Sequence, residues 1–122
     1  MKGLDVRFIS TIPQIMEKID FTYLEVLSED DDDFKDEFIV TFETTYVSLI
    51  KKMRDELANG EMDKLSKSAH QLKPSTKMIA LPCSDTLEDL QYHPEKASEE
   101  LIADINMQCE NALAQLKEWA GK

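Results

Sequence analysis

The sequence predicts an all-α protein, and three observations support this fold class. The chain of 122 residues contains only 3 glycines and 4 prolines, and apart from Pro74 these fall at boundaries between segments or near the chain ends. Apolar residues recur at intervals of three and four, which is the spacing of one face of a helix. The connections between the predicted helices are short, so consecutive helices are expected to be antiparallel neighbours. We therefore predict an antiparallel up-down-up-down four-helix bundle with a short N-terminal helical cap.

Residues 1–18 are expected to form a partly helical N-terminal extension, and residues 19–122 the bundle. Pro13 is expected to open a short helix that runs through Ile19. Asp20 then caps a second short helix, because an aspartate side chain accepts hydrogen bonds from the free amides of a first turn. The apolar residues of this second helix are Phe21, Leu24 and Leu27. Both short helices are expected to cover one end of the bundle.

The first long helix is expected from Asp32 to Asn59. Acidic residues from Asp30 to Asp33 crowd its start, where free amides and the helix dipole favour anions. At its end, Asn59 and Gly60 supply a left-handed stop. Its apolar face contains Phe34, Phe38, Phe42, Tyr46, Leu49, Ile50, Met53 and Leu57.

The second long helix is expected to begin at Glu61 or Met62 and to end near Ala80. Its apolar stripe contains Leu65, Ala69, Leu72, Thr76 and Ile79. The segment Leu81-Pro82-Cys83 forms the next corner.

Ser84 or Asp85 is expected to cap a short third helix, and Tyr92-His93-Pro94 to break it. The last helix is expected from about Glu95 to Trp119. The apolar positions of these two helices are Leu87, Leu90, Leu101, Ile105, Cys109, Ala112, Leu116 and Trp119.

The charge of the chain excludes several classes of partner. With 14 Lys+Arg against 25 Asp+Glu, the formal net charge is −11. A nucleic acid or an anionic membrane surface requires a basic face, so neither is an expected partner. No apolar run approaches the roughly 20 residues that span a bilayer, and the start of the chain has no signal-peptide core. Because Cys83 and Cys109 also fit a reducing compartment, we expect a cytoplasmic protein.

One histidine differs from this structural pattern. On a helical wheel, His70 points about 140° away from the stripe centred on Leu65 and Leu72, and therefore faces water. Lys73 and Lys77 share its side of the helix. Residues 61–80 carry four lysines against two carboxylates, whereas the other 102 residues carry 10 basic and 23 acidic groups. The second helix therefore concentrates positive charge in an acidic protein.

An exposed imidazole among ammonium groups is mostly neutral at pH 7 and offers a nucleophilic nitrogen lone pair. The product that these surroundings favour is an anion on the ring, because a phosphoryl group would gain charge-assisted contacts from Lys73 and Lys77. The spacing alone is more typical of a surface histidine among scattered lysines than of a reactive site.

The stretch Ala69-His70-Gln71-Leu72-Lys73-Pro74-Ser75 is similar to the H-x-L-K-G-S signature of histidine-containing phosphotransfer (HPt) domains, the modules that carry phosphoryl groups between receiver aspartates. The resemblance extends over about residues 19–119. It includes the short first helix with the long helix after it, the turn Asn59-Gly60-Glu61-Met62-Asp63, and the amphipathic segment Leu87–Gln91. Most members of the family have glycine where this chain has Pro74. Both residues keep the turn after His70 free of a long side chain, but Pro74 cannot donate to the carbonyl oxygen of His70 and is expected to bend the helix.

The resemblance implies that His70 is phosphorylated by a response-regulator receiver domain or a hybrid sensor histidine kinase and passes the group to another receiver. Lys73 and Lys77 would stabilise the phosphoryl group. The receiver would dock on Ser66, Lys67, Gln71 and Pro74. Counting outwards from the Leu81-Pro82 corner brings residues near Gln91 to Lys96 level with His70, where Gln91 or Tyr92 would orient the ring and Lys96 would add charge. The receiver would bring Mg²⁺, so the chain itself needs no cofactor and has no nucleotide-binding signature or autokinase activity.

Other interpretations are distinguishable from this one. A helical adaptor would bind a signalling partner without phosphotransfer. A histidine kinase dimerisation domain would dimerise through a two-helix hairpin and continue into an ATP-binding domain, whereas this bundle buries its own stripes and is expected to be a monomer. A zinc site would need His70, His93, Cys83 and Cys109 to converge on one ion, and their spacing does not favour it. His93 is more simply a loop residue, and Cys109 a packing residue.

Overall fold

The computed structural model describes residues 19–29 and 31–121. In these residues the regular structure is entirely helical, which confirms the all-α prediction. The helices are α2 (Thr22–Ser28), α3 (Asp32–Ala58), α4 (Met62–Met78), α5 (Cys83–Tyr92), the short 3-10 helix η1 (Pro94–Lys96) and α6 (Glu99–Trp119). The predicted extension 1–18, with the helix opened by Pro13, lies outside the described residues.

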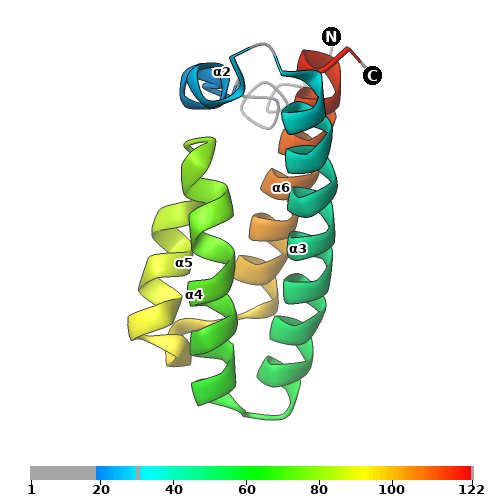
Figure 1. Cartoon of the computed structure of the whole chain (residues 1–122). Helices are drawn as coiled ribbons and strands as arrows, with labels where there is room; N and C mark the ends of the chain where they lie inside the picture. Colours follow the sequence, from blue (N-terminus) through cyan, green and yellow to red (C-terminus); the bar gives the residue numbers. More distant parts are fainter. Residues whose placement is uncertain (1–18, 30, 122) are drawn as a thin grey trace, which may run out of the picture.

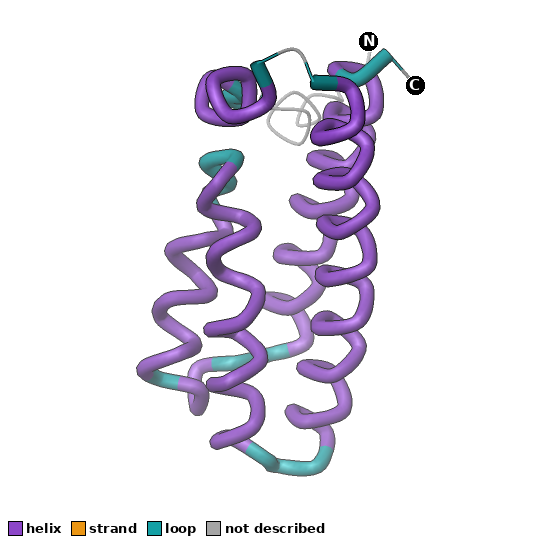
Figure 2. The backbone as a smooth tube through the Cα atoms, viewed as in Figure 1, coloured by secondary structure: helices purple, strands orange, loops and turns teal. Residues whose placement is uncertain are grey.

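The four longer helices lie side by side (Figure 1). Helix α4 contacts both α3 and α5, and α6 contacts both α3 and α5, so the four enclose one core. The chain descends along α3, turns at the lower end and returns along α4 (Figure 1). At that turn Gly60 has a φ of +70°, a left-handed conformation that glycine adopts without steric cost. The tube in Figure 2 shows how short this connection is.

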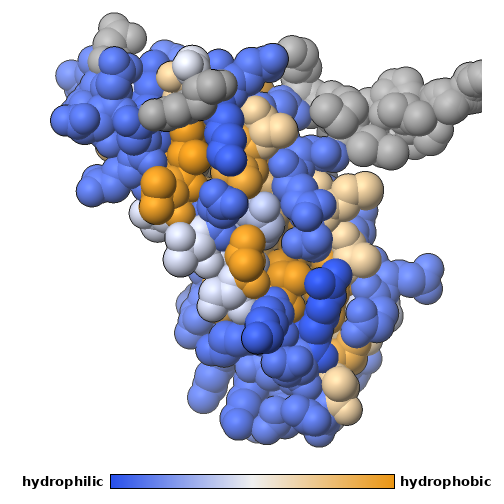
Figure 3. Space-filling model, turned by 90° about the vertical axis from the view of Figure 1, so that its right-hand side faces the viewer, coloured by the Kyte–Doolittle hydropathy of each residue, from blue (hydrophilic) through white to orange (hydrophobic). Residues whose placement is uncertain are grey.

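Most of the apolar positions predicted from the sequence form the core. Leu101 and Trp119 of α6 are only half-buried, whereas Ile39, Ile102 and Leu113 are buried and were not predicted. From α4, Leu65, Ala69, Leu72 and Thr76 are buried, and Ile79 follows them at the end of the helix. From α3, the buried stripe runs from Ile39 to Met53, and Phe34, Phe38 and Leu57 are half-buried at its ends. The surface over α3 and α6 keeps scattered apolar patches among polar ones (Figure 3). Val40 and Val47 of α3 are exposed.

Helix α2 covers the end of the bundle where α3 begins and α6 ends (Figure 1). Leu24 is buried, and Phe21 stacks on Trp119 with ring centroids 5.3 Å apart. The backbone amide of Ile19 donates to Gln115 Oε1 at 2.9 Å. Asp20 accepts from the Thr22 amide, and hydrogen bonds from Thr22 hold the pKa of Asp20 below its usual value.

Two helix starts differ from the prediction. Helix α5 begins at Cys83 and is not capped by Ser84 or Asp85: the Cys83 amide donates instead to Gln108 Oε1 of α6, at 2.8 Å. Helix α6 begins at Glu99, not near Glu95, because residues 94–96 form the 3-10 turn and Ser98 caps the helix through the Leu101 amide. Helix α4 stops at Met78, just before Ala80 takes a left-handed φ of +53°. By contrast, α3 starts as predicted, with Asp31 accepting from the amides of Asp33 and Phe34.

The different burial of Leu72 on α4 and Leu27 on α2 predicts a large difference in stability between their truncations to alanine. Leu72 is fully buried, whereas Leu27 is 42% exposed. Leu72→Ala should lower the free energy of unfolding by about 2–5 kcal/mol, because it deletes buried methyl groups and leaves a cavity. Leu27→Ala should cost under about 1 kcal/mol. Urea denaturation of the two variants tests this, and equal losses would contradict the assigned core.

Cys83 and Cys109 are buried and free. The neighbouring Cys83 thiol, together with burial, raises the pKa of the Cys109 thiol well above its usual range. Because both thiols are buried, and the Cys109 thiol also resists conversion to the reactive thiolate, neither cysteine should react with iodoacetamide in the folded protein, and both should react in 6 M guanidinium. Mass spectrometry of the alkylated chain checks this, and rapid modification of the native protein would overturn the burial assigned to the two thiols.

Candidate functional site

His70 lies on the outward face of α4 and is exposed to solvent. The buried stripe fixes this orientation, because Ala69 and Leu72 on either side of it point into the core. Within the described residues, the ring makes no hydrogen bond or ion pair. Pro74 lies inside α4, one turn beyond, and its nitrogen has no hydrogen to donate to the carbonyl oxygen of His70. The imidazole is therefore accessible and unrestrained by the protein.

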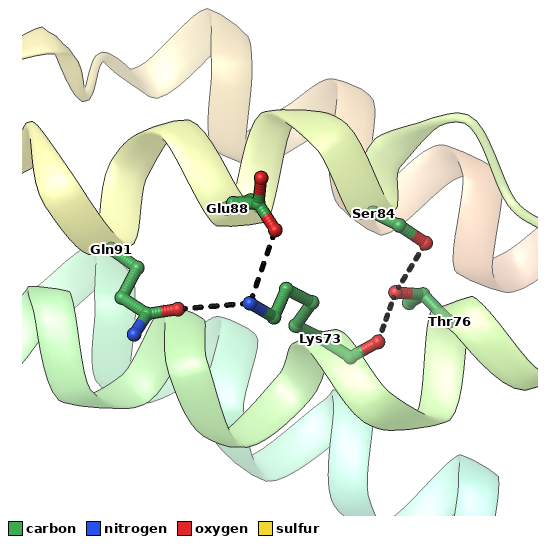
Figure 4. Close-up of polar contacts among 5 residues, drawn as sticks. All are labelled: Lys73, Thr76, Ser84, Glu88 and Gln91. Atoms are coloured by element: carbon green, nitrogen blue, oxygen red, sulfur yellow. Dashed lines mark hydrogen bonds and ion pairs between the residues drawn. The ribbon is translucent and has the colours of Figure 1, made fainter.

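Lys73 does not extend freely into solvent. Its ammonium nitrogen lies 3.3 Å from Glu88 Oε1 and 3.1 Å from Gln91 Oε1, both on α5 (Figure 4). The side chain is only 16% exposed. Positions three apart on a helix are neighbours, with Cβ atoms roughly 5–6 Å apart, so the Lys73 and His70 side chains leave α4 side by side, although the ammonium group itself is held by α5. Lys77, which is exposed, has no polar partner within the described part of the chain.

Gln91 holds the end of α5 against the His70 face of α4. Its backbone carbonyl accepts a hydrogen bond from the Ser66 hydroxyl at 2.5 Å, and its side-chain oxygen accepts from Lys73. Ser66 and Lys73 stand about one turn before and one turn after His70. Gln91 is therefore level with His70, as the count from the corner predicts. Its side-chain oxygen is bound to Lys73, and no contact within the described residues joins it to the ring.

The remaining predicted docking residues surround His70 at the surface. Lys67, Gln71 and Pro74 are exposed, whereas Ser66 is half-buried and its hydroxyl is committed to α5. Lys67 and Gln71 also border a hollow of about 430 Å³ between α3 and α4. At the bottom of this hollow Ser68 donates to the buried Glu56 carboxylate at 2.8 Å.

Three further residues named from the sequence, Tyr92, His93 and Lys96, make no polar contact with the imidazole of His70 within the described residues. Lys96 pairs with Asp89 at 3.4 Å, and Tyr92 is exposed without a polar contact in the described chain. His93 follows the end of α5, and its Nδ1 lies 3.6 Å from Glu95. In the described ranges, no three His, Cys, Asp or Glu side chains gather where they would hold a metal ion.

Several contacts at the site were not predicted from the sequence, among them three that follow His70 along α4. Glu88 pairs with Lys73, and the Ser84 hydroxyl donates to Thr76 Oγ1, which donates to the Lys73 carbonyl oxygen (Figure 4). The antiparallel count that placed Gln91 also places Glu88 opposite Lys73, so a signal for the first contact was present. Together these contacts fix α5 beside the segment of α4 that follows His70.

Comparison of the chain with protein-family models, curated proteins and solved structures finds no match. Nor does any helix in residues 19–29 and 31–121 combine the length and apolar character needed to cross a membrane.

The buried hydroxyl pair gives a stability prediction for the α4–α5 contact. Thr76→Val removes the acceptor of the Ser84 hydroxyl, which is only 6% exposed, and should cost about 1–3 kcal/mol of unfolding free energy. Adding Ser84→Ala should recover part of this loss, because no buried donor is then left unpaired. Thr44→Val, at an exposed position of α3, is the matched control and should be nearly neutral. Additive losses in the double variant, measured by denaturation, would show that the two hydroxyls are not coupled.

Proposed function

We propose that this chain is a histidine phosphocarrier of the HPt kind, in which His70 accepts a phosphoryl group from a receiver aspartate and passes it to another receiver. The observation that carries the proposal is the exposed His70 imidazole, free of polar contacts in the described structure, with Lys73 and Lys77 on the same side of α4. Such an arrangement suits a ring that must alternately accept and release a group. The signature-like residues from His70 to Ser75 support the same assignment.

The transfer is an in-line displacement at phosphorus. The lone pair of a His70 ring nitrogen forms a bond to phosphorus, and the bond from phosphorus to the aspartate oxygen breaks, leaving a carboxylate. The imidazolium produced releases its other ring proton to water or keeps it while phosphorylated. The receiver would supply the Mg²⁺ that neutralises the phosphoryl oxygens. In this proposal the chain supplies the nucleophile and two cations and needs neither ATP nor a cofactor.

The surface around His70 suits docking by an acidic receiver pocket. Lys67, Gln71 and Pro74 are exposed near the ring, and Pro74 keeps the following turn low. Lys67 and Lys77 present positive charge there, although the whole chain carries −11. We assign Ser66 a supporting role, because its hydroxyl is bonded to Gln91. We propose that the side-chain amide nitrogen of Gln91, which has no acceptor in the described part of the protein, donates to a phosphoryl oxygen on His70.

For the fold, we propose the up-down-up-down four-helix bundle with α2 as its cap. The order of contacts among α3, α4, α5 and α6 and their short connections support this topology. Burial of the apolar stripes within one chain supports a monomer. The two free thiols suit a reducing compartment such as the cytoplasm.

A helical adaptor without phosphotransfer is the second candidate, and one observation favours it. Lys73 is engaged by Glu88 and Gln91 and is therefore not free to bind a phosphoryl group without rearrangement. An adaptor would bind its signalling partner equally well after replacement of His70. Retained binding of a receiver that exchanges no phosphate with the chain would favour this second function.

The phosphocarrier proposal predicts labelling of one histidine. Incubation with a ³²P-phosphorylated cognate receiver should produce a phosphoprotein that is labile in acid and stable in base. His70→Gln should abolish the label, because the accepting nitrogen is removed. His93→Gln is the matched control and should label like the parent, since His93 lies apart at the end of α5. Undiminished labelling of His70→Gln would refute the proposal.

A further inference from the structure

The Lys73 ammonium group is held by α5 and is not directed freely toward His70. Two of its three donor positions are used, one by the Glu88 carboxylate and one by the Gln91 amide oxygen (Figure 4). Its side chain is 16% exposed, while Glu88 is 53% exposed. The carboxylate is therefore still well hydrated, and releasing the lysine from it is not costly.

We propose that Glu88 is a positioning residue that restrains Lys73 and competes with the phosphoryl group on His70 for its ammonium group. This inference rests on the proposed function and adds a regulatory element to the same site. Glu88 would lower the stability of the phosphohistidine, so that the chain releases the group more readily. A carrier that both receives and donates needs such a balance, because a product held too tightly is not passed on.

The competition follows from charge and reach. Phosphorylation places a dianionic group on a ring one turn from Lys73, within range of a lysine side chain on the same face. The Lys73 ammonium group can then pair either with the Glu88 carboxylate on α5 or with the phosphoryl oxygens on His70 of α4. Glu88 also repels the phosphoryl group directly, and only an experiment that varies Lys73 separates these two effects.

Lys77 and Asp89 provide internal comparisons. Lys77 has no polar partner in the described residues, so its contribution should not depend on Glu88. Asp89 is the next residue of α5 and is also a half-exposed carboxylate paired with a lysine, but its partner is Lys96. Asp89→Asn therefore removes the same charge from the same helix without releasing Lys73.

The test uses phosphoramidate, a small phosphoryl donor that requires no receiver. A bond forms between a His70 nitrogen and phosphorus, the phosphorus–nitrogen bond of the donor breaks, and ammonia leaves and takes up the ring proton. At a fixed ratio of phosphoramidate to ammonia, intact-mass spectrometry gives the equilibrium ratio of phosphorylated to free protein. All variants carry His93→Gln, so that only His70 is available as a histidine acceptor.

Glu88→Gln should raise this ratio about twofold to fivefold, the range expected when a partly exposed ion pair no longer competes. In a Lys73→Gln background, Glu88→Gln should change the ratio by less than about 1.5-fold, because the competing ammonium group is absent. The same substitution in a Lys77→Gln background should keep its full effect, and Asp89→Asn should have little effect. Equal thermal unfolding midpoints would show that the changes do not come from altered folding.

An equal rise in the parent and Lys73→Gln backgrounds would overturn the inference in favour of direct repulsion, and no rise in either would overturn it outright. Absence of any His70 phosphorylation by phosphoramidate would also overturn it. A failure of the proposed function would give a different result. In that case a phosphorylated receiver would leave His70 unlabelled, while phosphoramidate would still phosphorylate His70 and Glu88→Gln would still raise the phosphorylated fraction.

Discussion

The burial of one stripe of α4 determines the direction in which His70 points. Leu65, Ala69 and Leu72 are fully buried between α3 and α5, and a helix that buries these positions must present residue 70 to solvent. Rotation of α4 would expose two leucines and bury an imidazole without a hydrogen-bond partner, and both changes are unfavourable. The exposure of the ring is thus a consequence of core packing and does not depend on polar contacts at the ring.

The polar contacts of the site join α4 to α5 and do not involve the His70 ring. Ser66 and Lys73 both bond to Gln91, so the end of α5 is attached beside the face of α4 that carries His70. The buried Thr76 bonds to Ser84 within the α4–α5 contact. These contacts hold the Lys73 ammonium group and the Gln91 side chain beside the face of α4 that carries His70, and no polar contact within the described residues restrains the ring. Under the phosphocarrier proposal, this organisation would support a transient charged adduct on a ring that has no polar contact in the described residues.

The sequence predicts most of the helices because each carries a regular apolar stripe and a local start or stop signal. The start of α3 at Asp32 and its stop at Asn59-Gly60 depend on neighbouring residues alone, and both were predicted. The start of α5 was not predicted, since its first amide is bound by Gln108, 25 residues away on α6. The start of α6 was missed for a local reason: Ser98 is a good capping residue, but Pro94 drew the predicted start toward the 3-10 turn.

The candidate site divides in the same way. Exposure of His70 and its proximity to Lys73 follow from helical spacing within α4, and both were predicted. The pairing of the Lys73 ammonium group depends on which side chain of α5 lies opposite it, and a helical wheel for α4 contains no such information.

The role of His70 itself is best tested by nuclear magnetic resonance of ¹⁵N-histidine-labelled protein mixed with a phosphorylated receiver. Our account predicts that one ring nitrogen of His70 acquires a coupling to phosphorus while both nitrogens of His93 are unchanged; a receiver that binds and loses its phosphate while neither histidine gains that coupling would contradict it.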